Sequence, residues 1–117
     1  MNLIQRDVQG VTVLDLVGKL TAGENADKLG GRVATLVADG RTQVVLNLGQ
    51  LNYMDSSGLG QMIACYSKLK KAGAVVKLAQ TTTRIQDLLA ITKLVTVFDS
   101  YDTEALALAS FVTAVEA

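Results

Sequence analysis

The chain has 117 residues, no histidine and one cysteine, and its 11 basic and 11 acidic side chains give a formal charge of zero. A chain of this length can fold as one domain that buries about two thirds of its unfolded surface, without a metal or a disulfide. The lack of histidine excludes Ser-His-Asp and Cys-His catalysis and argues against a zinc site, and the balanced charge provides no field to attract nucleic acid or anionic lipid.

Half of the residues are hydrophobic but only 4% are aromatic, which favours an aliphatic core between layers of helices and sheet. The N-terminus lacks a basic segment leading into an apolar one, and no uncharged stretch approaches the roughly 20 residues that span a bilayer. We therefore expect no membrane insertion. The lone Cys65 is expected to be a small buried hydrophobe, compatible with a cytoplasmic location.

The first half of the chain begins with an expected hairpin. Residues 3–6 and 11–17 are predicted to form two strands around a tight turn at Gln9-Gly10. A loop at residues 19–25 then leads into a helix that ends at Asp39-Gly40, and Thr21 or a neighbour is a candidate for its N-terminal cap. The buried face of this helix is predicted at Ala26, Leu29, Val33, Leu36 and Val37.

The central stretch, residues 44–71, reads VVLNLGQLNYMDSSGLGQMIACYSKLKK. Residues 44–48 have the aliphatic pattern of a strand buried on both faces. After a connection, a helix is expected to begin near Ser56, with Asp55, Ser56 or Ser57 as its cap. Its buried positions are predicted at Leu59, Met62, Ile63, Tyr66 and Leu69, and its lysines at Lys68, Lys70 and Lys71 are interpreted as a solvated C-terminal turn.

The last third of the chain continues the alternation. After Gly73, residues 75–79 are predicted to form a strand, Thr81, Thr82 and Thr83 are cap candidates for a short helix, and residues 94–98 are predicted to form the last strand. Asp102 or Thr103 opens a final helix. The apolar positions of these two helices are Ile85, Leu88 and Leu89, and Leu108, Phe111, Val112 and Val115.

The order ββαβαβαβα predicts one α/β domain over residues 1–117, with a mixed, mostly parallel sheet and about four helices. In such sheets functional loops follow the carboxyl ends of the strands. Residues 19–25 and 50–57 meet that description, so we expect the functional site there.

Gly58 and Gly60 lie at the start of the expected central helix, where each glycine costs up to about 1 kcal/mol relative to alanine. Either close packing against a strand or close approach by another molecule can explain them. Gly18-Lys19 does not belong to a phosphate-binding G-x-x-x-x-G-K-[ST] loop, because Leu20 follows it and Val13 occupies the position of the first glycine. The segment MDSSG does not match a G-x-S-x-G nucleophile turn, because Met54 or Asp55 stands where the leading glycine belongs. A serine hydroxyl at a helix start fits a phosphoacceptor, because first-turn N–H groups stabilise the roughly −1.5 to −2 charges of a phosphate.

The motif MDSSGLG, with VTVLDLVGKLTAGENADKL before it and GAVVKLAQ after it, resembles the STAS domain of bacterial anti-sigma factor antagonists over nearly the whole chain. The resemblance implies a partner-switching protein that is not an enzyme and needs no cofactor or metal. Unphosphorylated, such a protein binds an anti-sigma factor, which is also a serine kinase of the histidine-kinase ATPase fold, and so releases a sigma factor. Phosphorylation ends the binding, and a PP2C-type phosphatase restores it.

Carried over to this chain, the resemblance places the phosphoacceptor at Ser56, with Ser57 as the fallback. The docking surface that it implies consists of Asp55, Ser57, Gly58, Leu59, Gly60, Thr21, Gly23 and Glu24. The chain departs from the pattern at Thr21, where many members have an aspartate linked to the phosphorylation surface.

Two other interpretations were compared with this one, and the first of them remains open. A STAS module that serves as a scaffold, or as a small-ligand or lipid-transport accessory without phosphorylation, gains support from the departure at Thr21. A response-regulator receiver with Asp55 as the acceptor is disfavoured. Gly18-Lys19-Leu20-Thr21 lacks the acidic pair that receivers carry after the first strand, and Thr96-Val97-Phe98 lacks their lysine.

Overall fold

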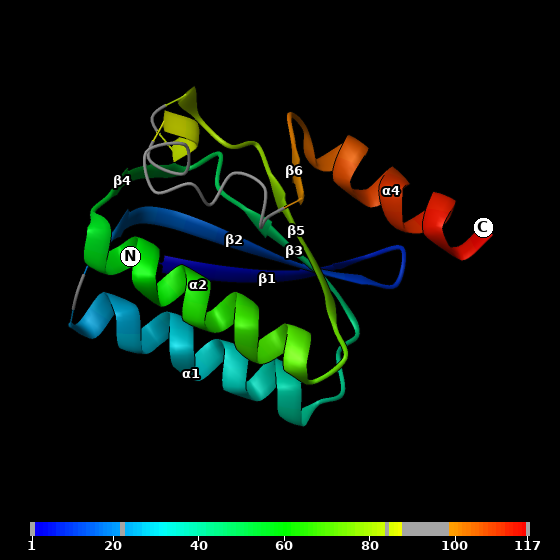
Figure 1. The fold of residues 1–117 in the computed structure, drawn as a ribbon, viewed down its shortest axis with the longest axis horizontal. Coiled ribbons are helices and arrows are strands. Elements are labelled where there is room, and N and C mark those ends of the chain that lie inside the picture. The colour runs from blue at the N-terminus through cyan, green and yellow to red at the C-terminus, as the bar shows by residue number, and fades with distance from the viewer. Residues whose placement is uncertain (1, 22, 84, 88–98, 117) are drawn as a thin grey trace.

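The computed structural model describes residues 2–21, 23–83, 85–87 and 99–116. A turn of helix at residues 83 and 85–87 lies between β5 and β6 (Figure 1). The elements with defined bounds are β1 (Asn2–Val8), β2 (Val11–Leu20), α1 (Glu24–Ala38), β3 (Gln43–Asn47), β4 (Leu51–Met54), α2 (Ser56–Lys71), β5 (Val75–Ala79), β6 (Asp99–Tyr101) and α4 (Glu104–Glu116).

The strands form a mixed sheet in the order β1-β2-β3-β5-β6, with β4 paired to β2 off this path. The β1–β2 pair is antiparallel and the other pairs are parallel, which confirms the expected mixed, mostly parallel sheet. At the hairpin turn, Gln9 and Gly10 both have positive φ, of 54° and 81°. This is the geometry of a type I′ turn, which suits the right-handed twist of the flanking strands.

Strand β4 corrects the prediction that residues 50–57 form a connection without a strand. Leu51 and Met54 are buried while Asn52 and Tyr53 between them are exposed. This spacing of three lacks the alternation that indicates a strand, so pattern reasoning missed it. The strand forms because Gly18, Lys19 and Leu20 continue β2 past a register shift and provide it with a partner.

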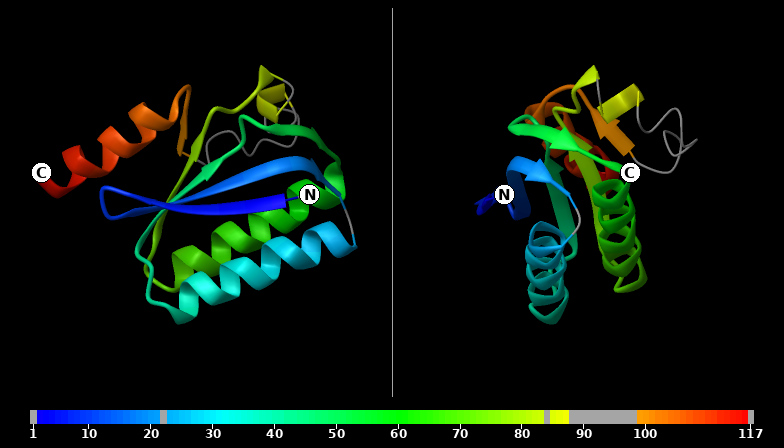
Figure 2. Two further views of the ribbon diagram at one scale, coloured as in Figure 1. Left: turned by 180° about the vertical axis from the view of Figure 1, so that it is seen from behind. Right: turned by 90° about the vertical axis from the view of Figure 1, so that its left-hand side faces the viewer.

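Helices α1 and α2 lie on one face of the sheet and α4 lies on the other (Figures 1 and 2), and each face has its own apolar core. Alternate residues of β2 and β3 point to opposite faces. Leu14 and Leu46 pack in the larger core with α1 and α2, whereas Val13 and Val45 pack with Phe111 of α4. The central strands are therefore covered on both sides, as their continuous aliphatic runs predict.

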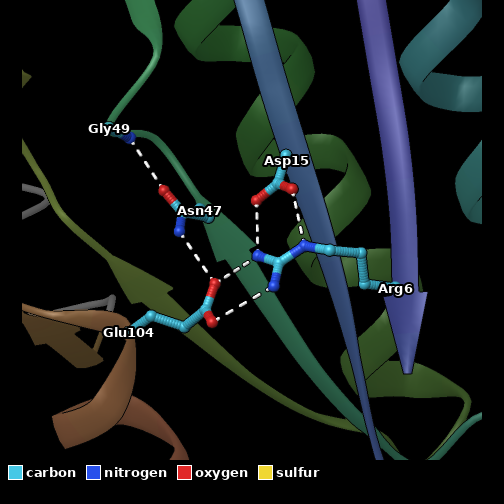
Figure 3. Close-up of polar contacts among 5 residues, drawn as sticks. All are labelled: Arg6, Asp15, Asn47, Gly49 and Glu104. Atoms are coloured by element: carbon cyan, nitrogen blue, oxygen red, sulfur yellow. Dashed lines mark hydrogen bonds and ion pairs between the residues drawn. The ribbon is translucent and has the colours of Figure 1, made fainter. Parts of the chain in front are cut away.

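Helix α4 is tied to the sheet by one polar network (Figure 3). The Arg6 guanidinium donates to both carboxylate oxygens of Asp15, at 2.8 and 2.9 Å, and to both carboxylate oxygens of Glu104 at the start of α4. The Asn47 amide donates to the same Glu104 carboxylate at 3.0 Å, and its oxygen accepts from the Gly49 N–H at 2.9 Å. The network therefore joins α4 to β1, β2, β3 and the turn that leads into β4.

The remaining predictions divide between the described and the undescribed residues. Among the cap candidates, the Thr82 and Thr103 hydroxyls accept from backbone N–H groups three residues on, which confirms both as caps. The predicted strand at residues 94–98 and the predicted core positions Leu88 and Leu89 lie outside the described residues; strand β6 begins at Asp99. Within the described chain, no helix is long and apolar enough to span a bilayer.

Candidate functional site

The two loops singled out from the sequence lie next to each other. Strands β2 and β4 run parallel, and their last residues, Leu20 and Met54, are paired. The chain leaves β2 toward α1 and leaves β4 toward α2, so both helices begin at this end of the molecule (Figure 1). The carboxyl ends of the two strands thus bring Thr21 and Gly23 to the same edge as Asp55, Ser56 and Ser57.

Asp55 is the N-terminal cap of α2. Its backbone is extended, with φ −98° and ψ −177°, and its Oδ1 accepts from the Gly58 N–H at 2.7 Å. The cap choice that the sequence left open is therefore settled for the aspartate. Ser56 and Ser57 occupy the first two helical positions, and both are exposed. Neither hydroxyl is needed to cap the helix, which leaves both accessible from solvent.

The electrostatics of α2 favour an anion at Ser56. The first N–H groups of a helix have no acceptor within it, and they lie at the positive end of its dipole. The first turn contains no acidic residue after the Asp55 cap, whereas Lys68, Lys70 and Lys71 occupy the last turn. These lysines are exposed, as the sequence predicts for a solvated helix end.

The two glycines of the first turns have different explanations. A Cβ at Gly58 would collide with the carbonyl oxygen of Leu20 and lie 2.8 Å from its carbonyl carbon. Close packing of α2 against the end of β2 therefore requires glycine at position 58. A Cβ at Gly60 would meet no atom within 4 Å, and this glycine is exposed. Among the described residues, no intramolecular contact therefore requires glycine at position 60.

Some residues of the docking surface that the resemblance implies are exposed, and others are buried in the domain. Ser57, Gly60 and Gly23 are exposed, Thr21 and Asp55 are partly buried, and Glu24 is the first residue of α1. The Leu59 side chain is 3% exposed and belongs to the larger core, and Gly58 is buried. Leu59 and Gly58 therefore hold α2 in place and present no side chain to a partner.

The cap of α1 differs from the first candidate named for it. Gly23 occupies the N-cap position with φ 83°, and no side chain caps the helix there. A positive φ of this size is readily adopted by glycine, and Thr21 lies two residues before the cap position. Thr21 is thus placed at the end of β2, beside the candidate site, and it does not cap α1.

Sequence reasoning missed Tyr53. Tyr53 lies on β4, where it pairs with Lys19 of β2. It is 39% exposed and lies three positions before Ser56. Aromatic side chains are enriched among the residues that contribute most to protein–protein binding. In the sequence, Asn52 and Tyr53 stand between the apolar residues Leu51 and Met54. This pattern becomes informative once β4 is recognised, because the two middle residues are then exposed.

The described residues contain no cluster of metal ligands and no activated thiol. Among the described residues, no group of three or more cysteine, aspartate or glutamate side chains is placed to hold a metal. Cys65 is buried, as expected, and burial raises the pKa of its thiol while nearby Lys68 opposes the shift. A thiol with a raised pKa is a poor nucleophile at neutral pH.

Comparison with known sequences identifies a family and a curated relative. The family model described as STAS domain matches residues 3–107. BtrV of Bordetella bronchiseptica, a protein named as a candidate anti-sigma factor antagonist, is 26% identical over 114 residues, which cover 97% of each chain.

Solved structures with the same fold have several roles. An anti-sigma factor antagonist from Mycobacterium paratuberculosis superimposes with a TM-score of 0.81 at 25% identity, over 93% of this chain and 92% of that one. The Bacillus cell fate determinant SpoIIAA in its phosphorylated form superimposes with a TM-score of 0.72 at 19% identity, over 94% of this chain and 99% of that one. A sulfate transporter family protein from Wolinella succinogenes superimposes with a TM-score of 0.81 at 19% identity, over 94% of this chain and 91% of that one. The last two similarities establish the fold alone.

Proposed function

Because the chain belongs to the STAS domain family, we propose that it acts as an anti-sigma factor antagonist controlled by phosphorylation of Ser56. In its unphosphorylated form it binds an anti-sigma factor, itself a serine kinase of the histidine-kinase ATPase fold, and frees a sigma factor. Phosphate on Ser56 ends the complex and a PP2C-type phosphatase restores it. The chain is a kinase substrate and a binding protein, and it catalyses no reaction itself.

The observation that carries this proposal is the exposed Ser56 hydroxyl at the positive end of α2. A kinase must reach the acceptor oxygen without unfolding its substrate, and an exposed residue in the first turn meets this requirement. The cap hydrogen bond is made by Asp55, so modification of Ser56 leaves it in place. We therefore expect the domain to remain folded when Ser56 is phosphorylated.

The effect of the phosphate then falls on the partner. In this proposal the docking surface surrounds Ser56 and consists of Tyr53, Asp55, Ser57 and Gly60, together with Thr21 and Gly23 of the adjoining loop and Glu24, the first residue of α1. A partner seated on this surface would desolvate two additional negative charges beside the Asp55 carboxylate. A cost of about 3 kcal/mol is enough to weaken the complex roughly a hundredfold.

Phosphosite mapping tests the assignment of the acceptor. The chain is incubated with ATP and the cognate ATPase-fold serine kinase, and the modified residue is located by mass spectrometry. We expect one phosphate on Ser56, its loss in Ser56→Ala and its retention in the matched Ser57→Ala variant. Phosphate on neither serine would refute the phosphorylation switch.

A STAS module without phosphorylation control is the second candidate, and Thr21 favours it. A threonine at this position can donate a hydrogen bond but lacks the negative charge of the aspartate that the family resemblance implies there. In this case the chain would bind its partner permanently, as a scaffold or as an accessory of a transport complex. Co-purification with transporter subunits, and no phosphate incorporation with any cognate kinase, would support this alternative.

A further inference from the structure

Strand β1 forms an open edge of the sheet. Within the described chain it pairs with β2 and with no other strand (Figure 2). Val8 and Val11 face each other across the two-residue turn and so form a hydrogen-bonded pair, and bonding alternates along the ladder. The N–H and C=O groups of Leu3, Gln5 and Asp7 therefore point away from β2, toward the position of an additional strand.

The N-terminal half of this edge lacks the usual protection. Exposed edge strands commonly carry charged residues that prevent pairing with another chain. Both charged residues of β1 lie in its C-terminal half and pair within the molecule: Arg6 with Asp15 and Glu104, and Asp7 with Arg41 at 2.7 Å. Residues 2–5 are uncharged, and the Ile4 side chain is 49% exposed.

A basic pocket lies directly beside this unprotected half. Its volume is about 250 Å³, and it is lined by Asn2 and Leu3 of β1 and by Lys28 and Arg32 of α1. The two basic residues are one helical turn apart, so both side chains lie on the same side of α1. Arg32 reaches the edge strand, where its Nη1 donates to the Gln5 side-chain oxygen at 3.2 Å.

The Arg32 guanidinium would gain from an anionic partner. In the described part of the chain it forms no ion pair, and its hydrogen-bond partner Gln5 is neutral. A carboxylate placed in the pocket would form charge-assisted hydrogen bonds, which are roughly twice as strong as bonds between neutral groups. The pocket therefore suits an acidic side chain that is delivered next to the β1 backbone.

We propose that the β1 edge binds an extended acidic segment of a second partner protein, which adds a strand to the sheet. The outward backbone groups of Leu3 and Gln5 provide the hydrogen bonds, and the pocket selects one side chain. The residue opposite Leu3 shares its face of the sheet and directs an acidic group toward Lys28 and Arg32. The residues on either side of this acidic residue in the added strand lie on the other face of the sheet. Apolar side chains at those two positions would cover the exposed Ile4.

A second copy of this chain is the competing occupant, and its acidic residue at the required position is already paired. Antiparallel pairing of two β1 strands about Gln5 would place the Asp7 of one copy opposite the Leu3 of the other. That carboxylate is engaged with Arg41 at 2.7 Å. The twofold axis would also bring Lys28 and Arg32 of both copies onto the same side of the joined sheet, where they repel one another.

Synthetic peptides test the proposal on the intact chain. The probe is a fluorescein-labelled octapeptide of alternating valine and threonine with one central glutamate, compared with matched glutamine and lysine peptides by fluorescence anisotropy. We expect the glutamate peptide to bind about tenfold more tightly than the glutamine peptide. Methylation of the backbone nitrogen of the glutamate, which faces Leu3 of β1, should abolish binding. Methylation of the backbone nitrogen of the next residue, which points away from β1, should not.

Charge reversal at the pocket gives the matched control. Arg32→Glu should shift the preference from the glutamate to the lysine peptide, whereas Lys71→Glu, an equal charge change at the far end of α2, should not. Circular dichroism confirms that both variants are folded. Equal binding of the three peptides, no effect of Arg32→Glu, or no binding at about 1 mM peptide would overturn the proposal. A dimer that is seen by analytical ultracentrifugation and lost in Ile4→Lys would overturn it in favour of self-association.

Discussion

Gly58 and Gly60 are two residues apart and have opposite roles. The first is required by the fold, because α2 packs against the Leu20 carbonyl at this position. The second faces open space and is accounted for by the proposed partner. The sequence offered both explanations for both glycines, and only the atoms around each position separate them.

The glycine pair provides the first prediction. Gly60→Ala should stabilise the chain by up to about 1 kcal/mol, because alanine favours the helix and its Cβ fits, yet it should weaken binding of the anti-sigma factor. Gly58→Ala should instead lower the free energy of unfolding by about 1–3 kcal/mol through overpacking. Urea titration measures the stabilities and calorimetry measures the binding. Gly60→Ala binding as tightly as the wild type would exclude close approach at that position.

The Asp55 cap provides a second prediction at the scale of the residue. Asp55→Ala should lower the free energy of unfolding by about 1 kcal/mol, because the Gly58 N–H loses its acceptor. Asp55→Asn keeps an oxygen at the same position and should lose less. Both free energies come from urea titration at neutral pH. Two variants as stable as the wild type would show that the 2.7 Å cap hydrogen bond contributes nothing.

At the scale of the element, α4 depends on its first residue. Glu104 accepts from Arg6 and from Asn47, and these hydrogen bonds join α4 to β1 and β3 in addition to the apolar packing of Phe111 (Figure 3). The Arg6 guanidinium lowers the pKa of the Glu104 carboxyl below its usual value of 4.5, and the Asn47 hydrogen bond acts in the same direction. The ionised form is therefore the one that holds the helix.

This lowered pKa predicts how stability depends on pH. The folded state favours ionised Glu104. The contribution of this carboxylate to the free energy of unfolding is therefore complete above its pKa in the unfolded chain, near 4.5. It is lost as the pH falls through the lower pKa that Glu104 has in the folded state. Unfolding free energies measured from pH 6 to 2 should therefore fall less steeply in Glu104→Gln than in the wild type. Identical slopes in the two proteins would rule out this linkage.

At the scale of the whole molecule, the sequence predicts those elements whose pattern is local. The hairpin, strand β5, the buried face of α2 and the buried positions Leu29, Val33 and Leu36 of α1 were predicted correctly, because their periodicity and turn residues are contained within each segment. The prediction for Ala26 falls outside the described side chains. Strand β4 was missed because its four residues form no alternating pattern and it exists through pairing with Gly18–Leu20. The network of α4 joins residues 98 positions apart, which no local pattern reveals.

The candidate site divides in the same way. The position of Ser56 at the start of a helix and the two loops at one edge could be predicted from the motif and the order of elements. The choice of Asp55 as the cap, the burial of Leu59 and the exposure of Tyr53 could not, because each depends on how α2 and β4 pack against β2.

The fold and the switch should be separable in the whole molecule. Ser56→Asp adds charge at an exposed position and should change the free energy of unfolding by no more than about 0.5 kcal/mol. Ser56→Ala should be equally stable. Thermal unfolding followed by circular dichroism measures both. A large loss of stability in Ser56→Asp would mean that charge at this position acts through the fold and not through the partner.

Calorimetric titration of the anti-sigma factor with the chain, before and after complete phosphorylation of Ser56, tests the central claim most directly. We predict tight binding by the unmodified chain and by Ser56→Ala, and affinity lower by roughly a hundredfold for the phosphorylated chain and for Ser56→Asp. Equal affinity of the modified and unmodified chains would contradict the account.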